Sequence, residues 1–163
     1  MNYSIVYSST TGNTQLLAQT IKNCLPEKEC IYYGEPKEDA KKADRLYVGF
    51  WTDKGTCDDA SAAFLKSLKE KEVFLFGTAG FGEDAAYFEK IQNRAKENLD
   101  ESVTVIGTYM CQGKMPMAVR KRYEKMLEQD PSSQKCSMLI ANFDKALSHP
   151  DEADLKKLEQ AIL

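Results

Sequence analysis

Consecutive residues near the N-terminus combine hydroxyl, amide and glycine chemistry in a way that predicts an anion-binding loop: Ser9-Thr10-Thr11-Gly12-Asn13-Thr14. The run follows a short apolar strand pattern over residues 2–7 and opens a predicted helix over residues 13–25. Backbone N–H groups at a helix start bind anions, and the helix dipole adds a favourable field. Because the run contains no Lys or Arg, unlike a nucleoside triphosphate loop, we expect it to hold a phosphate mainly by neutral donors.

Two later stretches also have compositions typical of a binding site. The first follows an apolar run over residues 45–51, which ends with the single tryptophan of the chain, Trp51. The second, residues 77–82, holds three glycines in six residues, so its backbone is expected to come close to another group. The candidate contact residues of these two stretches are Trp51, Thr52, Lys54, Gly55, Thr78, Ala79, Gly80 and Phe81.

The elements that must position these loops alternate between strand and helix. Strands are predicted at residues 2–7, 30–33, 45–51, 73–76 and 103–107, and helices at 13–25, 59–69 and 84–98, with a short polar helix or turn at 38–43. This alternation predicts an α/β fold with a parallel sheet, helices on both faces and right-handed crossovers. The carboxyl ends of parallel strands share one edge, where ligands bind. A phosphate loop and two aromatic-bearing loops at that edge fit a flat, phosphorylated heteroaromatic ring such as flavin mononucleotide (FMN).

The C-terminal part of the chain departs from this alternation. Helices are predicted over residues 116–128 and 133–147, and a last helix follows His149-Pro150-Asp151. A length of 163 residues is that of one domain. We therefore expect a single domain over residues 1–163 with an extra helical segment at about 110–148.

Composition and charge narrow the function classes. A net charge of −3 and an isoelectric point near 5.3 disfavour a nucleic-acid surface, which needs a concentrated basic patch. No apolar run approaches the roughly 20 residues that cross a bilayer, and no leader pattern precedes the first strand, so a cytoplasmic protein is expected. Five cysteines without a CxxC pair and a single histidine, His149, predict neither a disulfide framework nor a metal site.

The loop at residues 9–14 resembles the phosphate loop of the flavodoxin family, whose pattern Ser/Thr-x-Thr-Gly-x-Thr follows the first strand. The resemblance covers about residues 1–108 and the last helix. It implies a three-layer, doubly wound sheet of five parallel strands in the order 2-1-3-4-5, with FMN at the strand ends. It also implies phosphate contacts from the side chains of Ser9, Thr11, Asn13 and Thr14 and from the backbone N–H groups of Thr10 and Gly12. Segment 109–148 has no counterpart in a short-chain flavodoxin, which points to a divergent branch of the family.

Several residues around the expected ring have more than one interpretation. Trp51 and Phe81 are either ring contacts or core residues, and Gly55 either lets a peptide carbonyl turn towards a flavin nitrogen or forms a plain turn. Cys111 is either a reactive thiol or a buried structural cysteine, and Lys114 is placed to reach a carboxylate. A group of acidic residues would either disfavour an anionic reduced flavin and steer a basic partner, or cap helices: Asp53, Asp58, Asp59, Glu83 and Asp84.

The sequence therefore predicts an FMN-binding electron-transfer protein that passes electrons from a flavin reductase to a partner enzyme. The flavin supplies the redox chemistry, so no catalytic side chain is expected. No nucleic-acid partner and no membrane insertion are expected, and the oligomeric state stays open. The alternatives are an FMN-dependent NAD(P)H or quinone reductase whose substrate wall is the helical segment, an accessory flavoprotein module for one dedicated reductase, and a non-redox flavin-storage or interaction domain that has lost its ring contacts.

Overall fold

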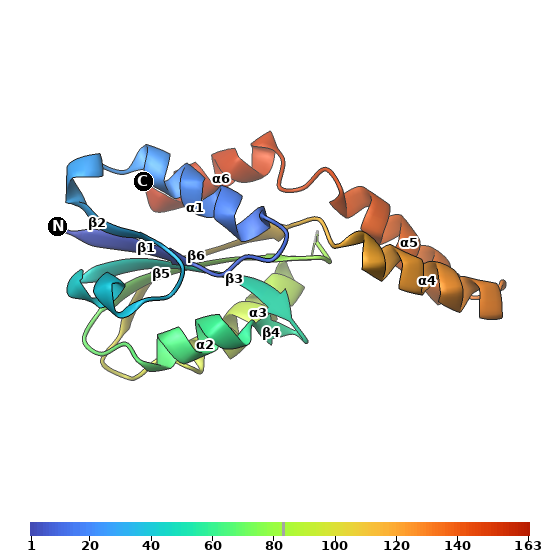
Figure 1. Ribbon diagram of the computed structural model, residues 1–163, viewed down its shortest axis with the longest axis horizontal. Helices are drawn as coiled ribbons and strands as arrows, with labels where there is room; N and C mark the ends of the chain where they lie inside the picture. Colours follow the sequence, from blue (N-terminus) through green and yellow to red (C-terminus); the bar gives the residue numbers. More distant parts are fainter. Residues whose placement is uncertain (83) are drawn as a thin grey trace.

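A largely parallel sheet forms the centre of the computed structural model, which describes residues 1–82 and 84–163 (Figure 1). Its strands lie in the order β2-β1-β3-β5-β6, and the short β4 pairs with β3. The strands are β1 (Tyr3–Tyr7), β2 (Cys30–Gly34), β3 (Arg45–Asp53), β4 (Thr56–Cys57), β5 (Glu72–Ala79) and β6 (Thr104–Gln112). Along that order each strand is parallel to its neighbour, so the predicted α/β fold and strand order are confirmed.

Strands extend further towards the candidate binding edge than their sequence patterns predicted. β3 runs to Asp53 and forms an antiparallel hairpin with β4, so much of the candidate stretch that follows the predicted strand at 45–51 is itself strand. β5 continues through Thr78 to Ala79, and β6 continues to Gln112, which places Cys111 within a strand and not after it. Glycine and polar residues weaken the strand pattern of these ends, whereas pairing with a neighbouring strand supplies the hydrogen bonds that extend them.

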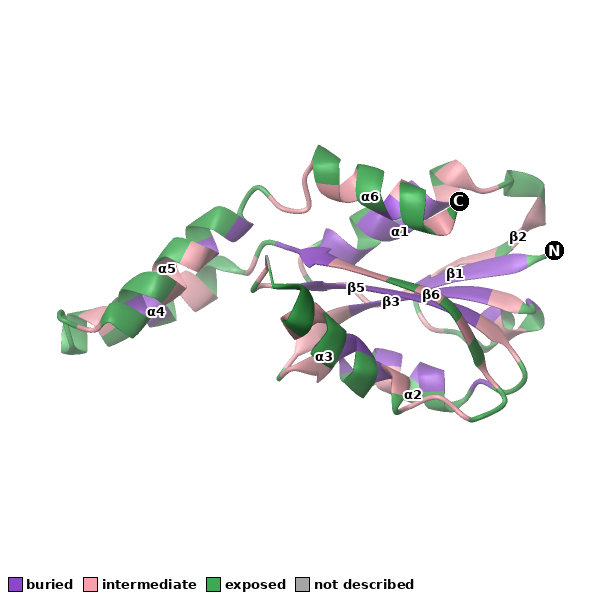
Figure 2. Cartoon of the chain, turned by 180° about the vertical axis from the view of Figure 1, so that it is seen from behind, coloured by how far each residue is buried: buried purple, intermediate pink, exposed green. Residues whose placement is uncertain are grey.

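Helices cover both faces of the sheet, and the central strands between them are buried (Figures 1 and 2). Helices α1 and α6 pack together on one face, and α2 and α3 lie on the other. The helices are α1 (Asn13–Cys24), α2 (Asp59–Lys66), α3 (Ala85–Lys96) and α6 (Glu152–Ile162), with short 3-10 helices η1 (Glu27–Glu29) and η2 (Glu38–Lys42) on either side of β2. Each face has its own buried core, one built around Leu17 and Leu158 and the other around Leu65 and Ile91.

Glycines on the central strands make room for large rings from the neighbouring strand. In the register of β3 and β5, Gly49 lies opposite Phe76, and Phe50 lies opposite Gly77. A Cβ on Gly49 would lie 2.3 Å from the Phe76 ring and 2.9 Å from the methyl group of Thr14. Both phenylalanines are fully buried and belong to different cores. The same strand pair therefore supplies one ring to each face of the sheet.

Residues 117–146 form a helical hairpin, here called the arm, that stands away from the sheet (Figure 1). The arm consists of α4 (Met117–Gln129) and α5 (Gln134–Ala146), which pack mainly on each other. The largest buried side chains of the arm are Tyr123, Cys136 and Phe143, and much of its remaining surface is exposed (Figure 2). Both helices predicted for this segment are thus present, with ends within one residue of those predicted. No helix in the described ranges has the length and apolar character needed to cross a bilayer.

The contact at Gly77 can be tested through stability. In Gly77→Ala the new Cβ would lie 2.4 Å from the Phe50 ring, so the free energy of unfolding is expected to fall by about 1–3 kcal/mol. Urea unfolding followed by circular dichroism measures this change. In a Phe50→Leu background the ring is absent, so the alanine should cost less than in the wild type. An equal cost in both backgrounds would contradict the contact.

Candidate functional site

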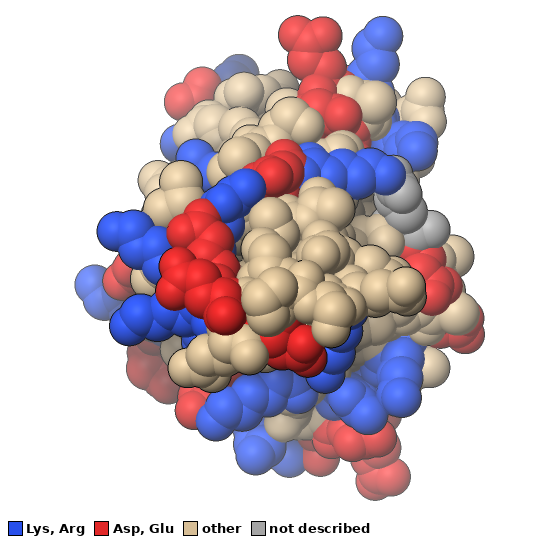
Figure 3. Space-filling view, turned by 90° about the vertical axis from the view of Figure 1, so that its right-hand side faces the viewer, with Lys and Arg blue, Asp and Glu red and all other residues tan. Residues whose placement is uncertain are grey.

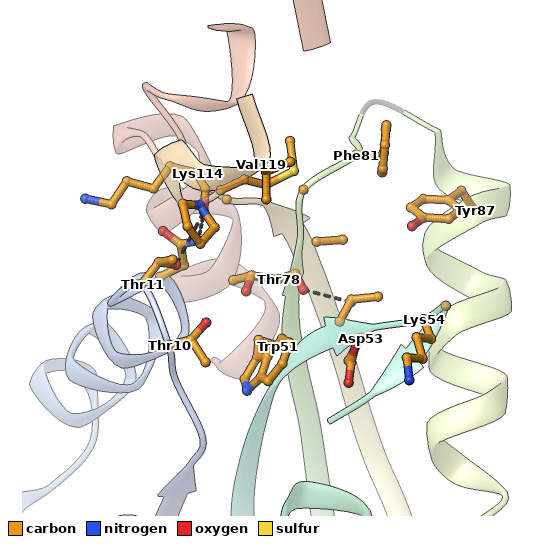
Figure 4. A pocket seen from close by; sticks show the side chains of 18 of the residues that line it. Thr10, Thr11, Trp51, Asp53, Lys54, Thr78, Phe81, Tyr87, Lys114 and Val119 are labelled. Carbon is orange, nitrogen blue, oxygen red and sulfur yellow. Dashed lines mark hydrogen bonds between the residues drawn. The ribbon is translucent and has the colours of Figure 1, made fainter. Parts of the chain in front are cut away.

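A cavity of about 570 Å³ opens at the carboxyl ends of the parallel strands (Figure 4). Segments far apart in the sequence meet there: the loop before α1, the β3–β4 hairpin, the end of β5, α3, and the segment from β6 into α4. The wall is formed by Thr10, Thr11, Asn13, Trp51, Thr52, Asp53, Lys54, Gly55, Thr78, Ala79, Gly80, Phe81, Tyr87, Gly113, Lys114, Met115, Pro116, Val119, Arg122 and Tyr123. Of the residues that the sequence predicted for the site, all except Ser9, Gly12 and Thr14 line this cavity.

The loop before α1 is partly capped from within, because the Ser9 hydroxyl accepts from the N–H of Gln15 in the first turn at 3.4 Å. Gly12 precedes the helix in a left-handed conformation with φ of 87°, and its N–H donates to the Ser9 hydroxyl at 3.2 Å. Thr11 Oγ1 and Asn13 Nδ2 donate to the backbone carbonyl of Lys114 at 3.3 and 2.8 Å. Ser9 therefore shapes the loop from within, while its neighbours connect the loop to the segment that leads into the arm.

Thr14 is buried and points into the sheet. Its hydroxyl donates to the carbonyl of Phe50 at 3.1 Å and lies 3.2 Å from the hydroxyl of Thr78. The family resemblance implied a phosphate contact for this side chain, but Thr14 is fully buried and does not line the cavity. The missing side chain at Gly49 leaves room for the Thr14 methyl group, so Thr14 anchors the start of α1 to β3 and β5.

The β3–β4 hairpin carries Trp51 into the cavity wall, where its side chain is half-buried. The Asp58 carboxylate accepts hydrogen bonds from the N–H of Trp51 at 3.3 Å and from the N–H of Ser61 at 3.2 Å. Asp58 is therefore both the cap of α2 and the link that holds this helix to the base of the hairpin.

The turn of the hairpin contains Lys54 and Gly55, whose φ values are 53° and 82°. The Gly55 carbonyl accepts from the Arg94 guanidinium of α3 at 3.1 Å, and the Thr52 hydroxyl donates to the Thr78 carbonyl at 2.8 Å. The hairpin is thus fastened to α3 at its tip and to β5 at its base. Gly55 lines the cavity, but its own carbonyl already has a donor.

Phe81 and Tyr87 form an aromatic pair on the α3 side of the cavity (Figure 4). Their ring centroids lie 6.5 Å apart and the rings are nearly perpendicular, at 89°. Phe81 is 40% exposed, which leaves its ring available to a ligand. Burial raises the pKa of Tyr87 above its ordinary value, so its hydroxyl is neutral at physiological pH. The sequence did not reveal Tyr87, because a single tyrosine within a helix carries no sign of the cavity it faces.

Part of the wall comes from residues that the sequence did not mark as candidate contacts: Tyr87, Gly113, Met115, Pro116, Val119, Arg122 and Tyr123. Most of them belong to α4 or to the segment before it. Lys114 lies among them and lines the cavity too. A Cβ on Gly113 would lie 2.4 Å from Asn13 Nδ2, so this glycine lets the segment approach the loop before α1. In the sequence, this glycine was the residue that could have indicated the close approach.

A hydrogen-bonded junction ties the base of the arm to the cavity wall. The Gly80 carbonyl accepts from Gln112 Nε2 at 2.9 Å and from Asn142 Nδ2 at 3.1 Å, and Gln112 Nε2 also donates to Asn142 Oδ1 at 3.1 Å. A Cβ on Gly80 would lie 2.5 Å from the sulfur of Met115. The arm and the loop that carries Phe81 therefore share one set of contacts.

The acidic residues noted in the sequence separate into different roles. Asp58 and Asp84 cap α2 and α3 through bonds to backbone N–H groups, and Asp59 lies in the first turn of α2. Asp53 lines the cavity. Glu83 lies outside the described residues. Helix capping, one of the interpretations given above, thus accounts for part of this group.

Two other candidates have structural roles. Cys111 is 3% exposed within the core beside α1 and α6, and burial raises the pKa of its thiol, which fits a protonated structural cysteine. His149 Nδ1 lies 2.7 Å from Asp154 Oδ2, and Asp151 and Asp154 form a capping box at the start of α6. The ligand atoms of these last three residues lie within 4.8 Å of one another, but their mutual hydrogen bonds account for the grouping.

A doubly wound parallel sheet with a hydroxyl-rich loop where the strand order reverses defines a flavodoxin-like α/β protein. The family model of the flavodoxin domain matches residues 4–163, and the chain belongs to the flavodoxin family. The match runs through the arm, whereas the motif resemblance had stopped near residue 108 and resumed only at the last helix. A flavodoxin-like domain-containing protein from Clostridium symbiosum, BilS, is 41% identical, and the alignment covers 100% of this chain and 95% of that protein.

Solved structures show the same fold. A flavodoxin from Streptococcus pneumoniae superposes with a TM-score of 0.60 at 16% identity, covering 98% of this chain and 94% of that chain. A flavoprotein from Lactobacillus acidophilus, solved in complex with FMN, gives a TM-score of 0.52 at 15% identity over 68% of this chain and 93% of that chain. At these identities the likeness concerns the fold alone.

The junction at Gly80 leads to a prediction about the arm. Asn142→Ala removes two side-chain hydrogen bonds, one to the Gly80 carbonyl and one from Gln112, each worth about 0.5–1.5 kcal/mol, so amide exchange in α4 and α5 should quicken at least about fivefold while the sheet is unchanged. Hydrogen–deuterium exchange with peptide resolution measures this. Met138→Ala, at a side chain of the same arm that is 71% exposed, is the matched control. If amide exchange in the arm were unchanged in the Asn142→Ala variant, the junction would not be what holds the arm in place.

Proposed function

We propose that this protein binds FMN and carries electrons from a reductase to a partner enzyme. The observation that supports this most is that the N-terminus of α1, with its hydroxyl-bearing loop, and an aromatic-walled cavity lie at the same strand ends. The flavoprotein from Lactobacillus acidophilus, whose fold is similar, binds FMN. The proposal includes the cytoplasm as the place of action.

The residues present fit an FMN molecule. The cavity volume of about 570 Å³ falls within the roughly 300–1,000 Å³ of small-molecule sites. Thr10 and Thr11 would offer hydroxyl and N–H donors to the phosphate at the start of α1, where the helix dipole favours an anion. Trp51 and Phe81 would contact the flat ring from the hairpin and from the end of β5.

FMN supplies one- or two-electron chemistry when it is bound. The protein would contribute binding, orientation and exclusion of water. Asp53 and Lys54 place charges of opposite sign on the hairpin at the cavity wall, and the neutral Tyr87 adds a hydroxyl without a charge. None of these roles needs a side chain that acts as a nucleophile or a general base.

The second candidate function is an FMN-dependent reductase, which one observation favours. Val119 and Tyr123 of the arm, together with Met115 just before it, extend the cavity wall beyond the strand-end loops. A wall of this kind would shelter a small substrate beside the flavin, whereas a simple carrier needs only an open flavin edge. An accessory module serving one dedicated reductase would use the same wall as a contact surface.

The phosphate assignment can be tested with a pair of ligands. Thr11→Val removes a hydroxyl at the proposed phosphate seat, and a hydrogen bond to a charged group contributes about 1.5–3 kcal/mol. The dissociation constant for FMN should therefore rise at least about tenfold, while that for riboflavin should stay within about twofold. Fluorescence titration of the flavin measures both constants. Thr104→Val, at the opposite end of β6, is the control, and an equal loss of both flavins would contradict the assignment.

Carrier and enzyme differ in their electron chemistry. The FMN-loaded protein alone should oxidise NADH and NADPH slowly, and an anaerobic redox titration should resolve separate one-electron steps. Stopped-flow absorbance and the visible spectrum provide the two measurements. Rapid oxidation of NADH or NADPH by the protein alone, with a single two-electron step in the titration, would favour the reductase function over the carrier function. A protein that takes up no FMN would overturn both.

A further inference from the structure

We propose that the outer face of α4, here called the basic face (Lys121, Arg122 and Lys125), docks an acidic surface of the protein that exchanges electrons with this one. The inference rests on the proposed function and goes beyond it, because it names the charge of the partner and the element that receives it. It concerns the arm and not the loops that surround the cavity.

The basic face is concentrated in an otherwise acidic protein. Residues 114–125 contain five lysines and arginines and one acidic residue, whereas the whole chain has a net charge of −3. Lys121 and Lys125 are one helical turn apart, with Arg122 beside them, and all are exposed. Tyr123, the buried side chain of α4, lies on the opposite side of the helix.

Ion pairing within the arm leaves this face free. Arg120 binds Glu124 and, at 2.9 Å, Asp144 of α5, so it serves to join the two helices. Within residues 1–82 and 84–163, no carboxylate lies within ion-pair distance of Lys121, Arg122 or Lys125. Like charges one turn apart on a helix are mildly destabilising. An acidic partner would offset that repulsion.

The position of the face suits electron transfer. Arg122 and Tyr123 line the cavity, so the basic face begins at the cavity rim and continues outward along the arm. The arm stands clear of the sheet in both ribbon views, which gives a large partner access to it (Figures 1 and 2). From the end of the molecule that carries the arm, charges of both signs surround an uncharged centre (Figure 3). A partner would therefore be oriented by the side of α4 and not by this end as a whole.

The surroundings of the face favour a protein over other polyanions. Met117 and Met126 of α4 are 56% and 40% exposed, and methionines adapt to apolar contacts of protein interfaces. A negative net charge opposes long polyanions such as nucleic acid, whose binding draws on many phosphate contacts at once. An acidic protein surface meets the short basic face and the neighbouring methionines together. Electrostatic steering would then speed encounter at low salt.

The test compares two double charge reversals in the FMN-loaded protein. Lys121→Glu/Lys125→Glu changes the basic face and leaves Arg122 at the cavity. Lys156→Glu/Lys157→Glu makes the same change of net charge at exposed residues of α6. The probe is a fluorescein-labelled oligoglutamate peptide, followed by fluorescence anisotropy at low and high salt. Circular dichroism and flavin content establish that each variant is folded and loaded.

The wild type should bind the peptide at low salt and lose it at high salt. The α4 reversal should raise the dissociation constant at least about tenfold, and the α6 reversal should change it less than about threefold. Equal losses in both variants, or no binding by the wild type, would overturn the inference. So would tighter binding of an oligothymidylate or of phosphatidylserine vesicles than of the peptide. Absence of FMN from the wild type would instead contradict the proposed function, so the two failures are distinguishable.

Discussion

The position of the candidate site depends on a close approach at Gly49. Where another residue would carry a Cβ, the Phe76 ring and the Thr14 methyl group fill the space. The Thr14 hydroxyl can then reach the carbonyl of Phe50 on the same strand. Apolar packing and a hydrogen bond thus act together to fix the first turn of α1 against β3. As a result, the loop before that turn stands open at the strand ends, beside the cavity.

Features that depend on local chemistry could be predicted from the sequence. The alternation of strands and helices predicted the parallel sheet, and the hydroxyl-rich loop and the glycines after residue 76 predicted much of the cavity wall, whereas the strand order was implied by the family resemblance of the loop. Tyr87 and Arg122 were not found, because a side chain in a helix gives no sign of which cavity it faces. Thr14 occupies the right position in the motif, but its burial against the sheet decided its direction, and burial is a property of the whole fold.

The arm lies within the family match and also contributes to the cavity. Val119 and Tyr123 belong to the cavity wall, so the arm is part of the candidate site and not a separate attachment. At its base, the side-chain amides of Gln112 and Asn142 bind the Gly80 carbonyl. Because hydrogen bonds are directional, they fix the angle at which the base of the arm meets the cavity wall, whereas an apolar contact alone would let the two surfaces slide past each other. The orientation of the arm is therefore set beside the cavity itself.

The backbone of Lys114 closes a ring of contacts. Its carbonyl accepts from Thr11 and Asn13, and its N–H donates to the carbonyl of His149 at 3.1 Å. An anion that draws the Thr11 hydroxyl or the Asn13 amide to itself must detach that group from the segment leading into the arm. By thermodynamic linkage, the free energy by which the ordered segment weakens anion binding equals the free energy by which a bound anion loosens the segment. Occupancy of the loop and order of the segment are therefore reciprocally linked.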